Sequence, residues 1–516
     1  MKQKVLTALC ALLFLPSYLF SQLYINNQIF SQNKIFYLTT SEEPSNQVIL
    51  QAASTLQNYL SKIFSSSYII EEIKPHSTME NILPSTLFPI ASEGIYLKVD
   101  PTLSSYLAFN IEPKSITIVT KEAASLLNAV YYFLEKYFNL LLFSTEDEIP
   151  TTQKRFDFSV SRYSFTPTFT TRNINSKLFN ESNNKKLLRL SSPFEKNNEL
   201  QFFTLLEKNL WPKLCLNKNE QLDSHITALN EVTKSNPDFK NCHFAICVND
   251  FEFCECPSCK KIKKSQRHKL IYNYANMVAK ALPEFNFILD LDENYTLPKE
   301  TKFEPNIFIR YEFNYSFNKP LHDSLYKKNN EIKRSLLQWK NMASRVIIRY
   351  PLFYKNSPLV YAPIFSNCGI TIKELASYGF TNMEVQLPTS ELTPFDDLKA
   401  YLTSQLMWDA TSNPQKIIKR FLSHYYGDAS TKLLSFINFA DNNAYYLDSM
   451  LDTKSDLKFH STGYLSWVMV KSYRNYFRAA LILANKKEPH SRNIKFLYGC
   501  VVEPGKILNY NIDENL

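Results

Sequence analysis

The sequence predicts an α/β protein in which a small N-terminal α/β domain is followed by a (β/α)8-like TIM barrel and a helical C-terminal region. Strand-like and helix-like segments alternate over most of the chain, a pattern typical of parallel sheets with helical crossovers. From about residue 414 onward the periodicity is mostly helical. The chain has 516 residues, of which 45% are hydrophobic and 14% aromatic, so it can bury large cores and disorder is not expected.

Residues 1–21 predict a secretory signal peptide. A basic start precedes the apolar run Val5–Phe20, and the small residue Ser21 follows it. A membrane anchor is the alternative, but Pro16 interrupts the run, which is shorter than the roughly 20 residues that a spanning helix needs. We therefore expect cleavage near Ser21, a secreted or periplasmic location, and no transmembrane segment.

Residues 22–150 predict a compact α/β domain. Apolar residues at spacings of three and four predict one helix with the stripe Leu50, Ala53, Leu56, Leu60 and Ile63. A second helix carries Leu126, Val130, Phe133, Leu134 and Phe138. The β-prone runs of this domain are residues 67–70, 94–99 and 115–120, and residues 146–154 are expected to form the exit linker.

Residues 160–412 predict the barrel, and residues 413–516 the helical region. Seven β-rich runs alternate with helical stretches, namely residues 169–175, 200–206, 243–250, 285–294, 306–315, 344–354 and 380–387. Seven strands are one short of a closed barrel. Either the eighth strand lies near Leu406–Asp409 or the barrel is incomplete, and periodicity leaves both possibilities open.

Several segments of the sequence resemble motifs of known families. In the first domain, Ala52–Leu60 and Leu127–Tyr137 resemble the N-terminal α/β domain of α-glucuronidases and β-hexosaminidases. The next 300 residues or so resemble the DUF4838 family in the phrases Leu214–Asn217, Asn249-Asp250 with Cys254–Cys259, Tyr401-Leu402 with Leu406–Asp409, and Phe421–Gly427. The resemblance implies a barrel next to a hexosaminidase-like domain and, by analogy, a glycoside hydrolase.

The sequence also departs from the family pattern. Between Gln201 and Lys213 the family's histidine-containing phrases are missing, and residues 291–296 replace its Ala-Tyr phrase. The leading hypothesis is an exported glycoside hydrolase that acts on a poly- or oligosaccharide. The alternative is a catalytically degenerate glycan-binding protein on the same fold, and an assembly or surface-interaction protein is a third class.

Glycoside hydrolysis needs two facing carboxyl groups, which in a barrel must lie at strand C-termini. This condition selects Asp250, Asp292, Glu293, Glu312 and Glu384. Asp250 follows a strand and matches the family phrase, so it is the first choice, although a cap or turn role is equally compatible. Glu312 and Glu384 are the other catalytic candidates. Alternatively, they are ordinary strand residues that face solvent.

A sugar site also needs stacking faces and groups that hydrogen-bond hydroxyls. The candidates near predicted strand ends are Arg172, Asn173, Asn175, Tyr311, Tyr315 and Tyr350, with Arg349 and Tyr354 as further members. An arginine fork could also clamp the carboxylate of a uronic acid. Ordinary core tyrosines and surface arginines are the alternative explanation for each of them.

The cysteines form the sharpest local motif, Cys254-x-Cys256-x-x-Cys259, with Cys215 earlier in the same domain. Four such thiolates could hold a structural zinc ion, whereas export favours disulfides, and both remain open. We expect no cofactor and no catalytic metal. The formal charge of +9 is scattered among acidic residues, so no nucleic-acid partner is expected. With 7 glycines and no Gly-x-Ser-x-Gly or His-Glu-x-x-His motif, nucleotide enzymes, serine hydrolases of that kind and zincins are disfavoured.

Overall fold

The structure is a computed structural model of the chain. It describes residues 21–31, 33–40, 43–74, 93–144, 155–179, 184–192, 199–201, 219–235, 243–247, 256–261, 263–295, 302–323, 326–485 and 487–513. Two compact units are present. The first extends to Pro167 and includes Asn183–Arg189, and the second comprises Thr168–Ser182 and the chain from Leu190 onward. The predicted signal sequence before Ser21 and the predicted linker, residues 146–154, lie outside the described residues.

The first unit is an α/β domain with two sheets, and it continues past residue 150, where its end was expected. Its larger sheet has the order β4-β3-β5-β7-β6-β9. The strands of this sheet are β3 (Lys34–Leu38), β4 (Ile69–Ile73), β5 (Gly94–Val99), β6 (Leu107–Glu112), β7 (Ser115–Thr120) and β9 (Ser161–Phe165). A small sheet contains β1 (Gln22–Ile25), β2 (Gln28–Ile29) and β8 (Arg155–Phe158).

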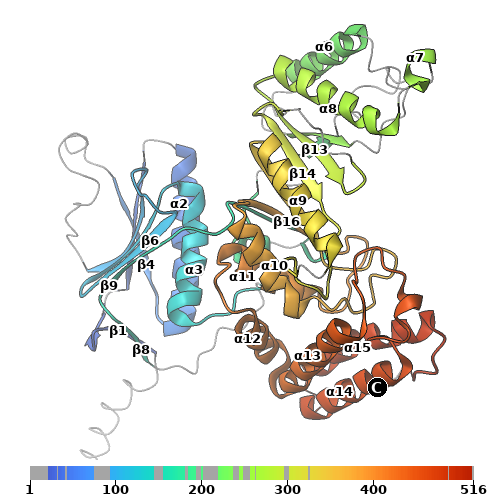
Figure 1. Cartoon of the computed structure of the whole chain (residues 1–516). Helices are drawn as coiled ribbons and strands as arrows, with labels where there is room; N and C mark the ends of the chain where they lie inside the picture. Colours follow the sequence, from blue (N-terminus) through green and yellow to red (C-terminus); the bar gives the residue numbers. More distant parts are fainter. Residues whose placement is uncertain are drawn as a thin grey trace, which may run out of the picture. The chain divides into compact units, whose positions relative to one another are not determined.

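Two long helices, α2 (Glu43–Phe64) and α3 (Leu126–Phe138), lie side by side against the larger sheet (Figure 1). The short elements η2 (Ala123–Ser125) and α4 (Asn184–Leu187) complete the described part of this unit. The stripe predicted for α3 is buried throughout. In α2 the stripe is buried except at Leu50, which is 43% exposed, because the helix presents Ile49 to the core instead.

A buried ion pair joins distant segments within the first unit. Arg189 is fully buried and donates to the carboxylate of Glu135 on α3. The guanidinium also lies 5.6 Å from the ring centre of Tyr132. Because charges taken out of water are stabilised only when they are paired, this contact fixes the segment around Arg189 against α3.

The second unit is built on a parallel sheet. Among the described residues it has seven strands in the order β10-β16-β15-β14-β13-β12-β11. They are β10 (Thr171–Asn175), β11 (Glu199–Gln201), β12 (His243–Cys247), β13 (Asn286–Asp292), β14 (Ile307–Glu312), β15 (Arg345–Pro351) and β16 (Asn382–Gln386). Six of them fall within runs that the sequence predicts, and β11 overlaps the predicted run 200–206 at its start. The first strand pairs with the last, as in a barrel.

The sheet described is a partial barrel, not a closed one of eight strands. Leu406–Trp408, where an eighth strand was expected, belong to helix α11 (Asp396–Trp408), and Asp409 is its C-cap. The acidic first turn of α11 and its helically spaced apolar residues favour a helix over a strand. A strand at Leu406–Asp409, one of the two possibilities that the sequence left open, is therefore not formed.

Helices cover one face of this sheet, among them α8 (Lys264–Ala281) and α9 (Lys327–Met342). On this face Tyr311 of β14 packs against Trp339 of α9, with 5.9 Å between the ring centres. The other face carries an apolar layer, Ala245, Ile288, Phe308 and Ile347. Before residue 396, the helical elements in the described part of this unit are η3 (Lys177–Phe179), α6 (Asn219–Ser235), α7 (Pro257–Lys260), α8 (Lys264–Ala281), α9 (Lys327–Met342) and α10 (Phe365–Ser377).

The C-terminal part of the second unit is helical, as predicted. It consists of α12 (Pro414–Tyr426), η8 (Gly427–Ala429), α13 (Ser430–Leu447), η9 (Leu457–His460), α14 (Trp467–Ala484) and α15 (His490–Ile507). None of the helices in the described part of the chain combines the length and the apolar character that crossing a bilayer requires.

Asp441 of α13 joins the helical region to the start of α10. Its carboxylate accepts hydrogen bonds from the Tyr361 hydroxyl and from the backbone N–H of Ser366, both at 2.7 Å. The side chain is buried, and burial raises the pKa of Asp441 to about 6. No cation is among the groups that determine this shift, so the charged form is disfavoured in the folded state.

We predict that Glu135→Gln destabilises the protein by about 3 kcal/mol, because it leaves the buried guanidinium of Arg189 without a countercharge. Chemical denaturation measures the change. Glu122→Gln, at an exposed position of the same unit, is the matched control and should stay within about 0.5 kcal/mol of wild type. Equal stability of the two variants would contradict the assigned role of the pair.

We also predict that Asp441 makes stability fall as pH rises. The folded protein holds the Asp441 proton more tightly than the unfolded chain, so this group stabilises the fold below about pH 4 and the contribution is lost as pH rises through about 6. The loss is about 3 kcal/mol. Urea denaturation of wild type and Asp441→Asn between pH 4 and 7 tests this, since the neutral variant should lack the decline. Parallel pH profiles for the two proteins would refute the prediction.

Candidate functional site

A row of polar residues crosses five neighbouring strands near their C-terminal ends. The strand register pairs Asp292 with Glu312, Glu312 with Arg349, Arg349 with Glu384, and Glu384 with Asn173. In a parallel sheet, residues paired in register point to the same face. This polar row lies on the face of the apolar layer, opposite the helices, where active sites of barrel enzymes are built.

Glu384 is the centre of the polar row. Its carboxylate accepts from Arg349 Nε at 2.9 Å and from Asn173 Nδ2 at 3.3 Å, and it lies 3.9 Å from Arg310 Nη1. Only 6% of the Glu384 side chain is exposed. Two arginines and one amide therefore surround a carboxylate that water scarcely reaches.

A second carboxylate lies two residues closer to the strand N-termini. Asp290 of β13 accepts two hydrogen bonds from Arg310 of β14, at 2.5 and 2.6 Å, in the bidentate geometry that a guanidinium favours. Arg349 Nη2 also approaches Asp290, at 3.4 Å. Arg310 and Arg349 thus each lie between Asp290 and Glu384, so the four charges form one network.

Glu312 occupies the more open part of the polar row. Its side chain is 16% exposed and accepts a hydrogen bond from Lys355 Nζ. Gln386 of β16 lies between Glu312 and Arg349. With its amide oriented to satisfy both neighbours, it donates to Glu312 at 3.1 Å and accepts from Arg349 at 3.3 Å.

The spacing of Glu312 and Glu384 suits a pair of carboxylates that act together. They lie on β14 and β16, separated by one strand, so their Cα atoms are roughly 10 Å apart at the usual distance between strands. This is a backbone separation, whereas the carboxyl groups of a glycosidase, at the ends of their side chains, are about 5 to 10 Å apart. The arrangement can therefore place one carboxylate on each side of a bond to be cleaved.

Several residues predicted to bind sugar lie elsewhere. Tyr311 and Tyr350 alternate with the polar row and face the other side of the sheet, and Tyr315 packs 4.4 Å from Tyr350 between ring centres. All three are buried, and burial raises the pKa of Tyr315 and Tyr350 well above the usual value. These are the surroundings of core tyrosines, so we do not include these residues in the site.

Arg172 is also placed away from the polar row. Its Nη1 donates to the backbone carbonyls of Phe169 and Thr170, and its guanidinium stacks 5.0 Å from the Trp408 ring. Asn173, in contrast, contacts Glu384 directly. Asn175, the next residue of β10 on the same face, pairs in register with Gln386.

Other predicted site residues cannot be placed. Asp250, Cys215 and Cys254 lie outside the described residues, and only the position of Cys259 in helix α7 is described. Cys256 precedes α7 and is half-buried. Among the described residues, no group of three or more His, Cys, Asp and Glu side chains is arranged to hold a metal ion.

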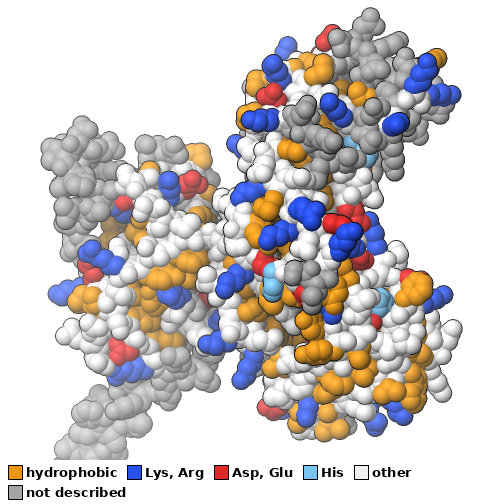
Figure 2. All heavy atoms as spheres, viewed as in Figure 1, with side chains coloured by type: hydrophobic (Ala, Val, Ile, Leu, Met, Phe, Trp, Pro, Cys, Tyr) orange, Lys and Arg blue, Asp and Glu red, His pale blue; other side chains and the backbone are white. Residues whose placement is uncertain are grey.

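Two surface hollows lie in the first unit and contain none of the polar row. One, of about 450 Å³, is lined by Leu23, Phe30 and Tyr68 among others, and one of about 370 Å³ by Tyr137 and Asp157 among others. On the face drawn in Figure 2, basic and acidic side chains are interspersed over the described surface, with no large patch of one sign.

Sequence reasoning missed Asp290, Arg310, Gln386 and Lys355. A signal for three of them was present, because Asp290, Arg310 and Gln386 each lie two residues from a selected polar position on the same predicted strand. Residues two apart on a strand share a face. Polar side chains interrupting apolar strands therefore mark the site better than strand-end carboxylates alone.

The DUF4838 family model, described as a domain of unknown function, matches residues 147–438, more than half of the chain. No curated protein matches the sequence. Similar solved structures include a GH138 enzyme targeting pectin rhamnogalacturonan II, with 9% identity, a TM-score of 0.48, and coverage of 92% of this chain and 86% of that one.

Two β-N-acetylhexosaminidases are also similar. The enzyme from Bacteroides fragilis NCTC 9343 has 14% identity, a TM-score of 0.41, and coverage of 73% of this chain and 86% of its own. The GH20 enzyme from Streptomyces coelicolor A3(2) has 11% identity, a TM-score of 0.41, and coverage of 78% and 92%. We infer no activity from likenesses at these identities and scores.

We predict that Arg310→Met destabilises the protein by about 3 kcal/mol, because it removes the bidentate partner of Asp290 and one of the cations beside Glu384. Arg334→Met, at an exposed position of α9, is the matched control. Thermal and urea denaturation of both variants check the prediction. A loss no larger than that of Arg334→Met would show that the charge network is not needed for stability.

Proposed function

We propose that this chain, which belongs to the DUF4838 family, is an exported glycoside hydrolase that cleaves a poly- or oligosaccharide at the C-terminal ends of the parallel strands. One observation carries the proposal: Glu312 and Glu384 lie on the same face of the sheet, in one row, on either side of Arg349. Most glycoside hydrolases use two carboxyl groups that flank the bond to be cleaved.

The surroundings of the two carboxylates suggest different roles. Glu384 is flanked by Arg310 and Arg349, an arrangement suited to a carboxylate that acts as a base or nucleophile. Glu312 is more open to solvent, so it can reach a leaving-group oxygen once substrate displaces Lys355. Asp250 remains the other candidate for the acid, from the family phrase that it matches.

Further groups of the network would bind and orient the sugar. Asn173 and Gln386 carry amides that can both donate to and accept from hydroxyl groups. Arg349 contacts Glu384, Asp290 and Gln386, so it fixes the relative positions of the carboxylates. Such fixed geometry is what lowers the barrier when a substrate binds between two reacting groups.

A second function is favoured by one specific observation. Both carboxylates proposed for catalysis already have a cation partner, Glu384 with Arg349 and Glu312 with Lys355. A protein that only binds glycan needs no proton donor, and such a paired network suffices for it. The alternative is therefore a glycan-binding protein that uses the same face without hydrolysis.

We predict that purified mature protein hydrolyses at least one member of a panel of aryl glycosides and oligosaccharides, and that Glu384→Gln lowers kcat by a factor of about 100 or more. Glu312→Gln and Asp250→Asn are measured beside it, and the variant with the larger loss identifies the acid. Reducing-sugar release and release of the aryl group are the readouts.

Glu331→Gln, at an exposed position of α9, is the matched control and should keep full activity. Far-UV circular dichroism and thermal melting show whether each variant remains folded. Absence of turnover on every substrate, together with glycan binding that survives in Glu384→Gln, would replace hydrolysis by the binding function.

A further inference from the structure

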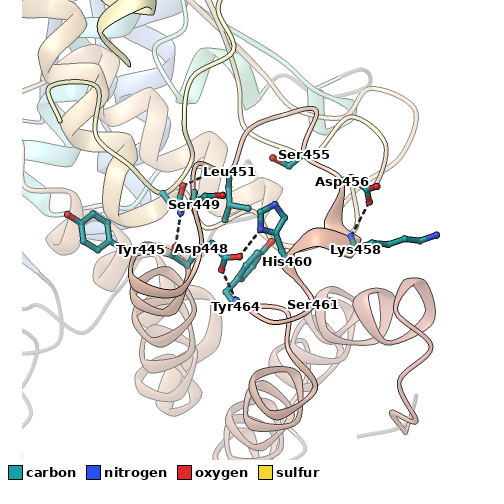
Figure 3. Close-up of polar contacts among 12 residues, drawn as sticks. Tyr445, Asp448, Ser449, Leu451, Ser455, Asp456, Lys458, His460, Ser461 and Tyr464 are labelled. Carbon is teal, nitrogen blue, oxygen red and sulfur yellow. Dashed lines mark hydrogen bonds and ion pairs between the residues drawn. The ribbon is translucent and has the colours of Figure 1, made fainter. Parts of the chain in front are cut away.

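The loop formed by residues 448–456 connects α13 to η9 in the helical region and is held rigidly at its start. Asp448 accepts from the backbone N–H of Tyr464 and contacts His460 Nδ1, both at 2.7 Å (Figure 3). Gly463 lies so close that a Cβ there would be 2.1 Å from Asp448 Oδ1. Only glycine fits at that position, so the loop start and the chain before α14 are packed without space between them.

The amide of Asn318 fastens the same loop to the segment that follows β14. It donates to the carbonyls of Ala444 and Ser449, at 2.7 and 2.8 Å, and accepts from Leu451 N at 3.0 Å. Asn318 is 3% exposed, so these three bonds are shielded from water. The carbonyl of Leu451 accepts in turn from Phe317 N at 2.7 Å.

The tip of the loop is bonded to chain segments that follow two strands of the sheet. The carbonyl of Thr453 accepts from Lys355 N at 2.9 Å, and its hydroxyl donates to Asn314 Oδ1 at 3.1 Å. Asn314 Nδ2 donates to Asp452 at 3.0 Å, and Lys328 pairs with the same carboxylate at 2.8 Å. The helical region therefore reaches the strand ends that carry Glu312 and Arg349.

Lys454 is the loop residue placed closest to the candidate carboxylates. Its Nζ donates to Glu293 Oε1, directly after β13, at 2.8 Å, and the two side chains are 46% and 32% exposed. The hydrogen bond to Glu293 raises the pKa of Lys454, and the charges of Asp292 and Glu312 add to the effect. The ammonium group thus lies within the electrostatic reach of the polar row.

We infer that the 448–456 loop forms one wall of the candidate site and that Lys454, together with Glu293, hydrogen-bonds a pair of neighbouring hydroxyl groups on the sugar. This inference rests on the proposed function. The Lys454–Glu293 pair offers a donor and an acceptor side by side, which matches hydroxyls that both donate and accept. An anionic group would instead meet the carboxylates of Asp292, Glu293 and Glu312.

The test measures binding in the Glu384→Gln background, so that ligand is not consumed. Calorimetry with neutral cello-, xylo- and manno-oligosaccharides and with oligogalacturonides compares that protein with the same protein carrying Lys454→Met. We expect Lys454→Met to weaken binding of the neutral ligand about tenfold, and Lys454→Arg to restore part of it. In the active protein, KM should rise about tenfold with kcat nearly unchanged.

Lys458→Met is the matched control. Lys458 lies on η9, four residues away, and its side chain extends away from Asp448 and His460 (Figure 3). Its backbone N–H donates a hydrogen bond to the Asp456 carboxylate, a contact that does not involve the lysine side chain. This variant should bind and turn over like its parent.

Three outcomes overturn the inference. Unchanged affinity in Lys454→Met would exclude Lys454 from the site and leave the proposal of hydrolysis untouched. A loss of affinity that is confined to oligogalacturonides and abolished by 0.5 M salt would mean that Lys454 binds an anionic group. Absence of binding to every oligosaccharide overturns both proposals. If the protein shows no turnover but Lys454→Met still weakens glycan binding, the inference stands and only the proposal of hydrolysis is refuted.

Discussion

The pairing of buried charges on the inner face of the parallel sheet is the interaction on which the second unit depends. Arg310 and Arg349 project from the same face of the sheet as the apolar layer of Ala245, Ile288, Phe308 and Ile347, and their side chains are only 5% and 18% exposed. Each guanidinium is compensated by Asp290 and Glu384, which in turn require the arginines. Because removing one member leaves a buried charge without a partner, the four residues constrain the register of β13 to β16 together.

The same network has consequences for chemistry. Charges held in fixed positions before substrate arrives need not reorganise during reaction, and this preorganisation is a main source of enzymatic rate enhancement. Next to this network, Glu312 and Lys355 are partly open to solvent at the strand ends. Glu384 is thus shielded from water, with 6% of its side chain exposed, whereas Glu312 in the same row is 16% exposed.

The helical region is bonded to the strand ends that carry the candidate site. Asn318 and Asn314 use side-chain amides to hold the loop between α13 and η9 against the ends of the strands. Lys454 reaches Glu293 across 161 positions of sequence. These contacts between residues far apart in the chain help to explain why the sheet and the helices form one compact unit.

The sequence by itself determined the local structure. Short β-rich runs between helical stretches located the seven described strands of the parallel sheet, and apolar residues at helical spacing located α3. It did not determine register, so it could not show that Glu312 and Glu384 share a row with Arg349, or that Tyr311 and Tyr350 face the opposite side. Local spacing also failed to show that α2 buries Ile49 and exposes Leu50, and it left open whether Leu406–Asp409 form a strand, where the chain is helical. Contacts between residues far apart in the chain, such as Arg310 with Asp290 and Lys454 with Glu293, exist only once the strands have paired, and tertiary structure alone decided them.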